Sequence, residues 1–320
     1  MQQKIEELCA RYHLPALAVA VARGDDSDIH VTGIRKAGHD VPVTADDVFH
    51  GGSCGKSITA MLARACAQPD DVLADLLPDM AMHDFYKSMT LFQLLTHSAG
   101  MPANYPDLNK LRDMEAAMSL PDIRWQMMSE TLAQPPEGGT RGVFQYSNLG
   151  YILLGVLVEK KAGNAFESLV RQQVFEKMGM SSAGFGCAAN ENAEKPNQPW
   201  GHIHHQDHKL EPVWGDNPAA YAPAGMIYAA LRDWLKFFQH LSKYIATQHE
   251  GAPLMGIGPS VYTALGLAYK DGIYSHDGSN TLNYMRVLLR PEASSVFVMA
   301  CNDASENSVS AIDEITGIFL

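Results

Sequence analysis

The sequence predicts an α+β protein in which an antiparallel sheet, built from both ends of the chain, carries an inserted and mainly helical domain. Extended segments rich in apolar and β-branched residues lie near both termini. Between them, from residue 53 to about residue 200, most segments show helical periodicity or are loops. We therefore expect residues 1–50 and about 222–320 to form the sheet domain, and residues about 51–221 to form the helical domain.

The extended segments predict two hairpins. Near the amino terminus, the apolar run PALAVAVA is followed by the polar turn GDDSD and by DIHVTGI. Near the carboxyl terminus, three further extended segments follow one another: TALGLAYK, LNYMRVLL and SSVFVMAC. The last two are joined by RPEA, which is typical of a turn between antiparallel strands.

Both termini predict helices that can cover the sheet. The opening segment MQQKIEELCARYHL has an apolar face made by Ile5, Leu8, Cys9 and Tyr12. The closing segment has one made by Val309, Ile312, Ile315 and Phe319.

The inserted domain contains several segments with clear helix signals. Thr90 is a candidate N-cap for LFQLLTH, and SITAMLARACA precedes it. The segments GYILLGVLVEKKAG and AFESLVRQQVFEKMG each stop at a glycine, which is typical of a helix C-terminus. A later helix, LRDWLKFFQHLSKYI, interrupts the extended region that follows the inserted domain.

Composition excludes some function classes. The 320 residues carry a formal net charge of −12 and no cluster of Lys and Arg, which argues against a nucleic-acid partner. The five cysteines are dispersed, without zinc or CxxC spacing, so we expect reduced thiols. The chain lacks an apolar stretch of membrane-spanning length and a recognisable signal peptide. The expected location is cytoplasmic, or periplasmic or secreted if a leader has been removed.

The segment GGSCGKSITAML carries the strongest chemical signal. Ser53 and Lys56 are three residues apart, so they share one face if Ser53 begins the helix. A serine hydroxyl becomes a good nucleophile when a neighbouring base takes its proton. Lysine can be that base when burial lowers its pKa. The helix N-terminus would also stabilise an oxyanion formed at Ser53.

Two alternatives use the same residues. Ser53 could be an N-cap with Lys56 exposed to solvent. Alternatively, residues 51–55 fit G-x-S-x-G, the nucleophile elbow of α/β-hydrolases. That fold places several βα units before the elbow, whereas only short extended segments precede Ser53, and Lys56 would then have no role.

Two further segments can complete a site. Tyr146 and Asn148 precede a strongly apolar helix, where a phenol could relay a proton and an amide could orient a lysine or bind a substrate carbonyl. A loop tyrosine followed by an N-cap is the alternative. His276, Gly278 and Ser279 precede the last hairpin, where a glycine on an edge strand would allow a substrate to approach closely. A simple turn at DGSN is the alternative there.

Taken together, these motifs resemble the serine β-lactamases of class C, the low-molecular-weight penicillin-binding proteins (D-alanyl-D-alanine carboxypeptidases) and the related esterases. The order S-x-x-K, Y-S-N and then Lys/His-x-Gly is that of the family. The resemblance covers most of the chain and includes LPALAVAVARG, VPVTADDVFHGGSCGKSITAML, LFQLLTHSAGMP, YSNLGYILLGVLVEKKAG, VFEKMGM, APAGMIYAALRDWLKFFQHL and SHDGSNTLNYMRVLLRP. It implies the β-lactamase/transpeptidase-like fold, with the active site between the two domains.

The resemblance also implies a role for each matched residue. Ser53 would attack the substrate, Lys56 would accept its proton and Tyr146 would assist the proton transfers. Asn148 would position the substrate amide, and His276 stands where many relatives have lysine. The backbone N–H groups of Ser53 and Ser279 would form the oxyanion hole, with Gly278 beside them. No cofactor is implied.

One departure from the family bears on the substrate. Where β-lactamases and DD-peptidases have Lys-Thr-Gly, this chain has His276, Asp277 and Gly278. If the Asp277 carboxylate faces the site, it would repel a substrate carboxylate by about 1 to 4 kcal/mol at 4 Å. This argument ranks neutral esters and amides above penicillins and D-alanyl-D-alanine termini, and it lapses if Asp277 points away.

Other chemically suggestive residues are assigned structural roles. Cys54 follows Ser53 and is expected in the core. His97 is expected to be buried and hydrogen-bonded. The segment WGHIHHQDH contains four histidines, but we expect no metal there: His202 and His204 share a face only if the segment is a strand.

The sequence therefore predicts a serine hydrolase that forms an acyl-enzyme on Ser53, with esterase, amidase or peptidase activity on small acyl substrates. The alternatives are a penicillin-binding sensor that acylates without efficient turnover, a true β-lactamase or DD-carboxypeptidase, and a structural relative without activity. The presence of all the matched side chains argues against the last. The oligomeric state is left open.

Overall fold

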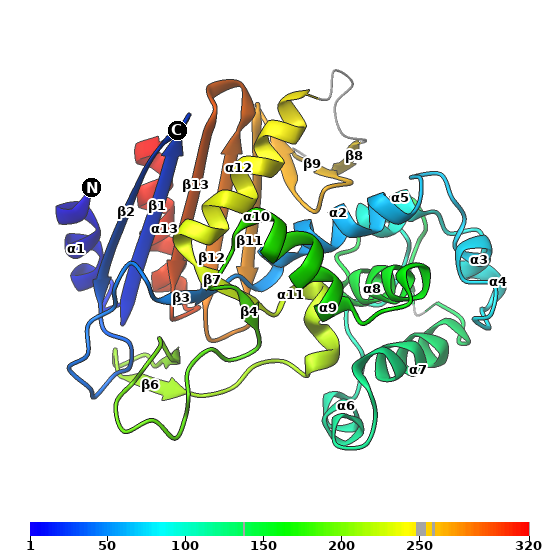
Figure 1. Ribbon diagram of the computed structural model, residues 1–320, viewed down its shortest axis with the longest axis horizontal. Helices are drawn as coiled ribbons and strands as arrows, with labels where there is room; N and C mark the ends of the chain where they lie inside the picture. Colours follow the sequence, from blue (N-terminus) through cyan, green and yellow to red (C-terminus); the bar gives the residue numbers. More distant parts are fainter. Residues whose placement is uncertain (137, 248–253, 258–259, 320) are drawn as a thin grey trace.

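The central element is an eight-stranded antiparallel sheet with the order β2-β1-β13-β12-β11-β10-β9-β8 (Figure 1). The computed structural model describes residues 1–136, 138–247, 254–257 and 260–319. The strands are β1 (Ala16–Arg23), β2 (Asp26–Gly33), β8 (Leu254–Ile257), β9 (Ser260–Thr263), β10 (Ala268–Lys270), β11 (Ile273–Ser279), β12 (Tyr284–Arg290) and β13 (Ser295–Cys301). As predicted, both ends of the chain supply this sheet, and both predicted hairpins are present.

Alternation along β1 explains how the sheet is covered on two faces. The alanines at even positions from 16 to 22 belong to the same buried cluster as the apolar face of α12 (Leu231–Thr247). Leu17, Val19 and Val21 point to the opposite face, where they pack with the terminal helices. Small side chains on one face and larger ones on the other thus allow α12 to lie close against the strands.

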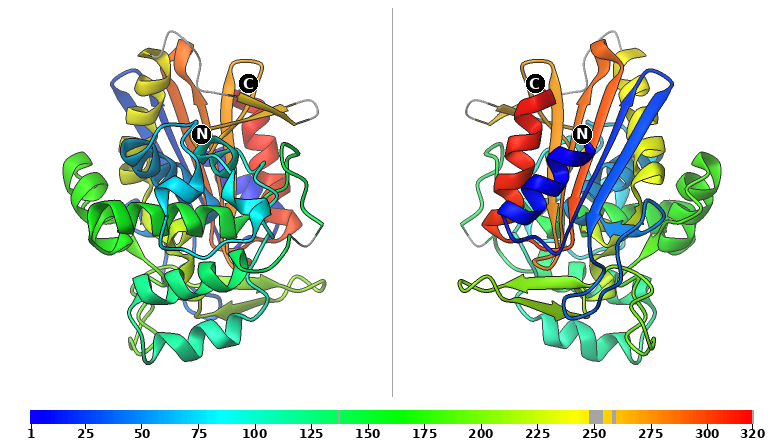
Figure 2. Two further views of the ribbon diagram at one scale, coloured as in Figure 1. Left: turned by 90° about the vertical axis from the view of Figure 1, so that its right-hand side faces the viewer. Right: turned by 90° about the vertical axis from the view of Figure 1, so that its left-hand side faces the viewer.

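The terminal helices α1 (Gln2–Arg11) and α13 (Glu306–Phe319) lie against the same face of the sheet (Figure 2). Their predicted apolar faces are confirmed, with Ile5 and Ile312 fully buried. Tyr12 of the amino-terminal segment donates a hydrogen bond to Glu314 of α13 at 2.6 Å, which ties the two ends of the chain together.

A separate helical cluster has its own buried core. The helices of this part of the chain are α2 (Lys56–Cys66), α3 (Leu73–Leu76), α4 (Asp84–Lys87), α5 (Leu91–Leu95), α6 (Leu108–Glu115), α7 (Leu120–Leu132), α8 (Asn148–Ala162), α9 (Phe166–Val170) and α10 (Glu176–Met178). The α8 helix is apolar on all sides because α2, α5, α7 and α11 (Ala222–Gly225) surround it. It ends at Gly163, whose φ of +66° is the left-handed conformation expected of a terminating glycine.

The remaining described strands form two smaller sheets, one of three strands and one of two. The strand β3 (Val48–His50) pairs with β7 (Ile227–Ala230), which also pairs with β4 (Gly184–Phe185). A further hairpin is formed by β5 (Gly201–His204) and β6 (Leu210–Val213). Because β4, β5 and β6 fall within the range predicted to be mainly helical, the insertion is not purely helical. The division into two domains stays a prediction.

Two predicted elements differ from the structure. The segment TALGLAYK, predicted as one strand, is divided between β9 and β10 because Gly266 adopts a φ of +70°, which turns the chain. The segment AFESLVRQQVFEKMG, predicted as one helix, is interrupted by a π-helical turn at Arg171–Phe175. Within the described part of the chain, none of the helices is long and apolar enough to cross a membrane.

Candidate active site

The candidate nucleophile lies on a tight turn between β3 and α2. A 3-10 turn, η1 (Gly52–Gly55), precedes the helix, so Ser53 and Lys56 follow one another on its first turns. Gly52 has a φ of +49°, and a Cβ atom there would lie 2.4 Å from the Ser279 nitrogen. A side chain at position 52 would therefore push β11 away from Ser53, and only glycine allows this close approach.

Lys56 is fully buried and its amine contacts three groups. The Nζ atom lies 3.0 Å from Ser53 Oγ and 2.7 Å from Asn148 Oδ1, and it also contacts the Ala224 carbonyl oxygen. Asn148 Oδ1 and the Ala224 oxygen can only accept hydrogen bonds, whereas the serine hydroxyl can also donate one. The three partners fit both protonation states of Lys56: an ammonium can donate to all of them, and a neutral amine can donate to Asn148 and Ala224 and direct its lone pair at the Ser53 hydroxyl.

Burial shifts the protonation of Lys56 toward the neutral amine. Removal from water disfavours the charged ammonium and lowers the pKa of Lys56 to about 7. The two neighbouring imidazoles, His97 and His276, also have lowered pKa values because they are buried and lie near Lys56. Lys56 can therefore be a neutral base near neutral pH, which an exposed lysine cannot.

Tyr146 and Asn148 reach the same point from the loop that begins α8. Ser147 caps this helix: its Oγ accepts a hydrogen bond from the Gly150 N–H and donates one to the Pro102 carbonyl. Burial raises the pKa of the Tyr146 phenol, while the neighbouring Ser53 side chain lowers it less, so Tyr146 remains a neutral O–H group beside Ser53. The Asn148 amide is fixed at both ends, because its Nδ2 donates to Asn104 Oδ1 at 2.8 Å while its Oδ1 binds Lys56.

The turn before α8 is held in place by His97. The His97 Nδ1 atom accepts a hydrogen bond from the Ser147 N–H at 3.1 Å, and its ring centroid lies 4.3 Å from that of Tyr146. His97 is 2% exposed. This buried, hydrogen-bonded position agrees with the structural role expected of His97.

Strand β11 closes the site on the opposite side from α8. A Cβ atom at Gly278 would lie 2.0 Å from the Gly51 carbonyl oxygen and 2.9 Å from the Ser53 nitrogen, so Gly278 faces the nucleophile turn. Strand β10 pairs only with residues 273–275 of β11. Within the described residues, no strand pairs with residues 276–279 on that side, so this part of β11 has the open edge that a glycine-containing edge strand was expected to give.

His276 lies behind the reacting groups. Its Nδ1 atom is 2.9 Å from the Gly266 carbonyl oxygen, to which it must donate, and 3.2 Å from the Tyr262 hydroxyl. Burial lowers the pKa of His276 to about 4, so the ring is neutral at neutral pH. It is absent from the described residues that line the cavity at Ser53. The contact between His276 and the substrate stays a prediction. Because the ring is neutral, His276 would not offer the substrate a positive charge.

Asp277 does not face the site, contrary to the premise of the substrate argument above. Its carboxylate pairs with Arg286, 2.6 Å away, and Arg286 also binds Asp313 of α13. These groups lie on the face of the sheet that the terminal helices cover, because residues 277 and 278 of a strand point to opposite faces. The repulsion assigned to Asp277 therefore lapses.

A cavity of about 260 Å³ opens at Ser53. Its lining is polar but uncharged: the described residues around it are Ser53, Asn104, Leu108, Asn148, Asn217, Tyr221, Ala224, Gly225, Ser279, Asn280 and Thr281. Sequence analysis identified Ser53, Asn148 and Ser279 among these. Asn104, Asn280 and the Ala224 carbonyl were missed, since they belong to no motif that carries chemistry by itself.

Cys54, His202 and His204, which were assigned structural roles from the sequence, make contacts that the proposed reaction does not use. Cys54 is fully buried, burial raises the pKa of its thiol, and its Sγ lies 3.5 Å from the His276 carbonyl oxygen. His202 and His204 do share a strand, β5, where His202 binds the Asn302 carbonyl and His204 binds Asp303. Across the described ranges, no group of three or more His, Cys, Asp or Glu side chains could hold a metal ion.

Comparison with known proteins identifies the family. The sequence profile of the family described as Beta-lactamase matches residues 1–316. The chain belongs to the Beta-lactamase family. This result confirms the resemblance drawn from the S-x-x-K, Y-S-N and His-x-Gly segments.

Members of the Beta-lactamase family with diverse names are similar to the chain. Penicillin-binding protein 4 of Amycolatopsis lactamdurans is 26% identical over 257 residues, which are 77% of this chain and 64% of that protein. An unguisins hydrolase of Aspergillus campestris is 25% identical over 252 residues, which are 75% of this chain and 46% of that protein. The chain thus spans about half to two thirds of the length of these curated relatives.

The fold is also found among solved structures. The β-lactamase/D-alanine carboxypeptidase of Pseudomonas syringae superposes with a TM-score of 0.75 at 16% identity, over 99% of this chain and 97% of that chain. The β-lactamase/transpeptidase fold predicted from the sequence is therefore confirmed.

Proposed function

We propose that this Beta-lactamase family member is a serine hydrolase that forms an acyl-enzyme on Ser53. The observation that carries the proposal is the buried Lys56 amine, 3.0 Å from Ser53 Oγ and held by two groups that can only accept hydrogen bonds. In acylation, Ser53 Oγ bonds to the substrate carbonyl carbon and its proton passes to Lys56. The Tyr146 phenol supplies a proton to the leaving group, and Lys56 restores the phenol.

The negative charge formed on the carbonyl oxygen needs two donors. The backbone N–H groups of Ser53 and Ser279 are the proposed pair, and both residues line the cavity. Water would then attack the acyl-enzyme by the reverse proton route, with Lys56 and Tyr146 again exchanging the proton.

We further propose that the preferred substrates are small neutral esters or amides. Support comes from the cavity, where none of the described lining residues carries a charge. The carboxylate of a penicillin would find no cationic side chain among them, and the net charge of −12 adds an unfavourable field. One similar protein is named an unguisins hydrolase, so the names of the relatives are compatible with hydrolysis of substrates other than β-lactams.

The test is a labelling and turnover experiment. Treatment with a fluorophosphonate should add one adduct by intact mass, and peptide mapping should locate it on Ser53. The 4-nitrophenyl esters of hexanoic acid and of adipic acid have six-carbon acyl chains and differ by one carboxylate. We expect kcat/KM to be about tenfold higher for the neutral ester, which corresponds to about 1.4 kcal/mol.

Each other outcome has a defined meaning. An adduct on a different residue would contradict Ser53 as nucleophile. Equal rates on the two esters, or fast hydrolysis of nitrocefin, would contradict the preference for neutral substrates. A protein that is labelled on Ser53 but turns over no acyl substrate would favour the sensor function.

The pH dependence of acylation gives a second prediction. Because burial lowers the pKa of Lys56 to about 7, the neutral base should be lost as pH falls below that value. We expect the acylation rate to drop about tenfold per pH unit below about pH 6.5 and to level off above about pH 7.5. Single-turnover rates with 4-nitrophenyl acetate between pH 5 and 10, corrected for spontaneous hydrolysis of the ester, measure this. A rate that kept rising to pH 10, as an exposed lysine requires, would rule out the buried neutral amine.

A further inference from the structure

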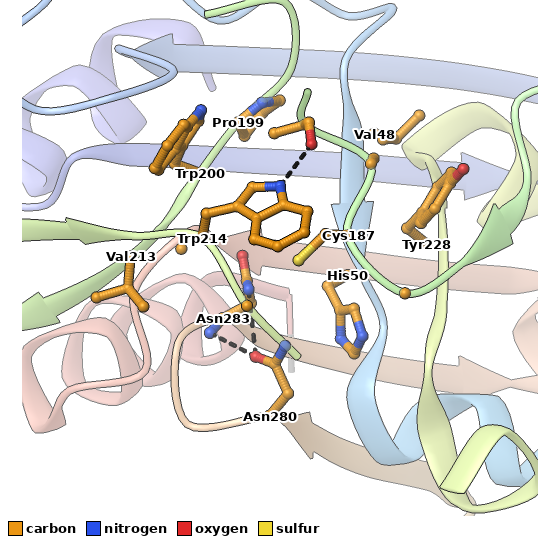
Figure 3. Close-up of a pocket in the computed structure, with 15 residues that line it drawn as sticks. Val48, His50, Cys187, Pro199, Trp200, Val213, Trp214, Tyr228, Asn280 and Asn283 are labelled. Atoms are coloured by element: carbon orange, nitrogen blue, oxygen red, sulfur yellow. Dashed lines mark hydrogen bonds between the residues drawn. The ribbon is translucent and has the colours of Figure 1, made fainter. Parts of the chain in front are cut away.

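A second cluster of polar side chains lies directly behind the nucleophile turn. The Asp216 carboxylate, whose side chain is 6% exposed, is 2.9 Å from His50 Nε2 and accepts a hydrogen bond from Asn280 Nδ2 at 3.0 Å. It also accepts one from the Asn217 N–H at 2.8 Å. Figure 3 shows His50, on β3, and Asn280, after β11, at the same end of a pocket. None of the catalytic roles proposed above uses Asp216 or His50.

Hydrogen-bond donors and acceptors fix the state of the His50 ring. The Gly52 N–H donates to His50 Nδ1 at 3.0 Å, so Nδ1 must be an acceptor. The proton of the neutral ring is therefore on Nε2, where it is donated to Asp216 Oδ2. Asp216 thus reaches the backbone of Gly52, the residue before Ser53, through one imidazole.

On its other side, Asp216 reaches the residue after Ser279. Asn280 donates its amide N–H to Asp216 and uses its Oδ1 to accept hydrogen bonds from the N–H groups of Leu282 and Asn283. This amide therefore orders the turn at which β11 ends. One carboxylate is linked to both chain segments that carry the proposed oxyanion donors, Ser53 N–H and Ser279 N–H.

The spacing of these two segments has little tolerance. Gly52 has a left-handed backbone whose ideal Cβ would be 2.4 Å from the Ser279 nitrogen, so η1 and β11 are nearly in contact there. The Gly52 N–H and the Ser53 N–H belong to successive peptide planes that meet at the Gly52 Cα atom, so a change in the first plane alters the backbone torsions of Gly52 and moves the Ser53 N–H. Oxyanion stabilisation needs donors about 2.7–3.1 Å from the developing charge, so a small rotation is enough to weaken it.

We propose that Asp216 is a positioning residue that, through His50 and Asn280, aligns the two backbone N–H groups of the oxyanion hole. The proposal rests on the acyl-enzyme function proposed above. Burial acts to raise the pKa of Asp216, but the pKa is lowered overall, and the hydrogen bonds that the group accepts from His50, Asn280 and the Asn217 N–H all favour the carboxylate. A carboxylate can accept from all three donors at once, whereas a neutral amide cannot.

The variant Asp216→Asn tests this requirement because it keeps the shape and removes the charge. The NH₂ group of the new side chain cannot accept a hydrogen bond, yet it must face one of the three present donors: His50 Nε2–H, Asn280 Nδ2 or Asn217 N–H. One of the three hydrogen bonds is therefore lost. We expect kcat for 4-nitrophenyl acetate to fall about 30-fold with KM changed less than about twofold, a smaller loss than removal of an oxyanion donor causes. Affinity for phenylboronic acid, whose adduct with Ser53 places an oxygen in the oxyanion hole, should fall by a similar factor.

Asp233→Asn is the matched control. Asp233 is fully buried and accepts hydrogen bonds from the Ser182 N–H and hydroxyl, but it has no link to η1 or β11 in the hydrogen bonds described for it. Its loss of stability should resemble that of Asp216→Asn, while kcat per labelled molecule stays within about twofold of wild type. Equal loss in both variants would reduce Asp216 to a structural role.

Two substitutions of His50 separate its contacts and serve if Asp216→Asn does not fold. His50→Asn can keep an acceptor for the Gly52 N–H, whereas His50→Gln can keep only the donor to Asp216. We expect the kcat of the asparagine variant to be at least about fivefold higher than that of the glutamine variant. Unchanged kcat and boronate affinity in Asp216→Asn, or a larger kcat in His50→Gln, would overturn the proposal. Failure of the wild-type protein to be labelled at Ser53 would instead refute the acyl-enzyme function.

Discussion

Replacing Ser53 with alanine is expected to abolish labelling by fluorophosphonate and to lower kcat/KM for 4-nitrophenyl acetate by about 10⁴-fold or more. The hydroxyl is the atom that would become covalently bound to the acyl group, and Asn148, the other cavity-lining side chain hydrogen-bonded to Lys56, carries an amide and no nucleophilic hydroxyl. Water positioned in its place would lack the proximity of an attached nucleophile. Intact-mass analysis and initial rates provide the two measurements.

Ser57→Ala is the matched control for this substitution. Ser57 lies at the start of α2 and is fully buried, and its hydroxyl is directed to the Gly266 carbonyl oxygen rather than to Lys56. Its rate should stay within about threefold of wild type. An adduct that persists in Ser53→Ala, or equal losses in the two variants, would show that Ser53 is not the nucleophile.

From the motifs we could predict which residues lie together at the site, but not how the residues around them are oriented. Ser53, in η1, and Lys56, at the start of α2, are three residues apart on one continuous helical segment, so their contact follows from local helix geometry. The contact of Lys56 with Asn148, 92 residues further along, could be expected only from the resemblance to a family whose fold brings these segments together. Helix geometry therefore predicts the Ser53–Lys56 contact, and the family resemblance predicts the contact of Lys56 with Asn148.

The error at Asp277 could have been avoided with the sequence alone. If Gly278 faces Ser53, its neighbour in an extended strand must face the other side of the sheet. The position of His276 could not be deduced in this way. It shares the face of Gly278, but Tyr262 and Gly266 cover it, and their approach depends on the turn between β9 and β10.

The link from Asp216 to His50 spans 166 residues and belongs to no recognisable pattern. Their role depends on which atoms meet in the folded chain. Hydrogen bonds of this kind become visible only when donors and acceptors can be counted in three dimensions.

Replacing Lys56 with methionine is expected to slow acylation of Ser53 by about 10³-fold, which corresponds to a barrier higher by about 4 kcal/mol. Methionine has a similar length and no basic nitrogen, so the Ser53 proton has no acceptor in the position of Nζ. The Asn148 amide oxygen and the Ala224 carbonyl also lose their donor, which should lower the free energy of unfolding by about 1 to 3 kcal/mol. Rates are therefore measured per folded molecule, with Lys161→Met, at an exposed position of α8, as control.

Lys56→Arg distinguishes a base from a fixed positive charge. A guanidinium remains protonated at every accessible pH, so it can donate to Asn148 but cannot accept the Ser53 proton. We expect this variant to be as slow as Lys56→Met, and we expect both to lose the rise in rate through pH 7 that the wild-type amine gives. Activity within about tenfold of wild type in Lys56→Arg would mean that residue 56 acts by its charge. The proton of Ser53 would then have to leave by way of Tyr146, whose phenol is the other titratable group that interacts with the Ser53 side chain.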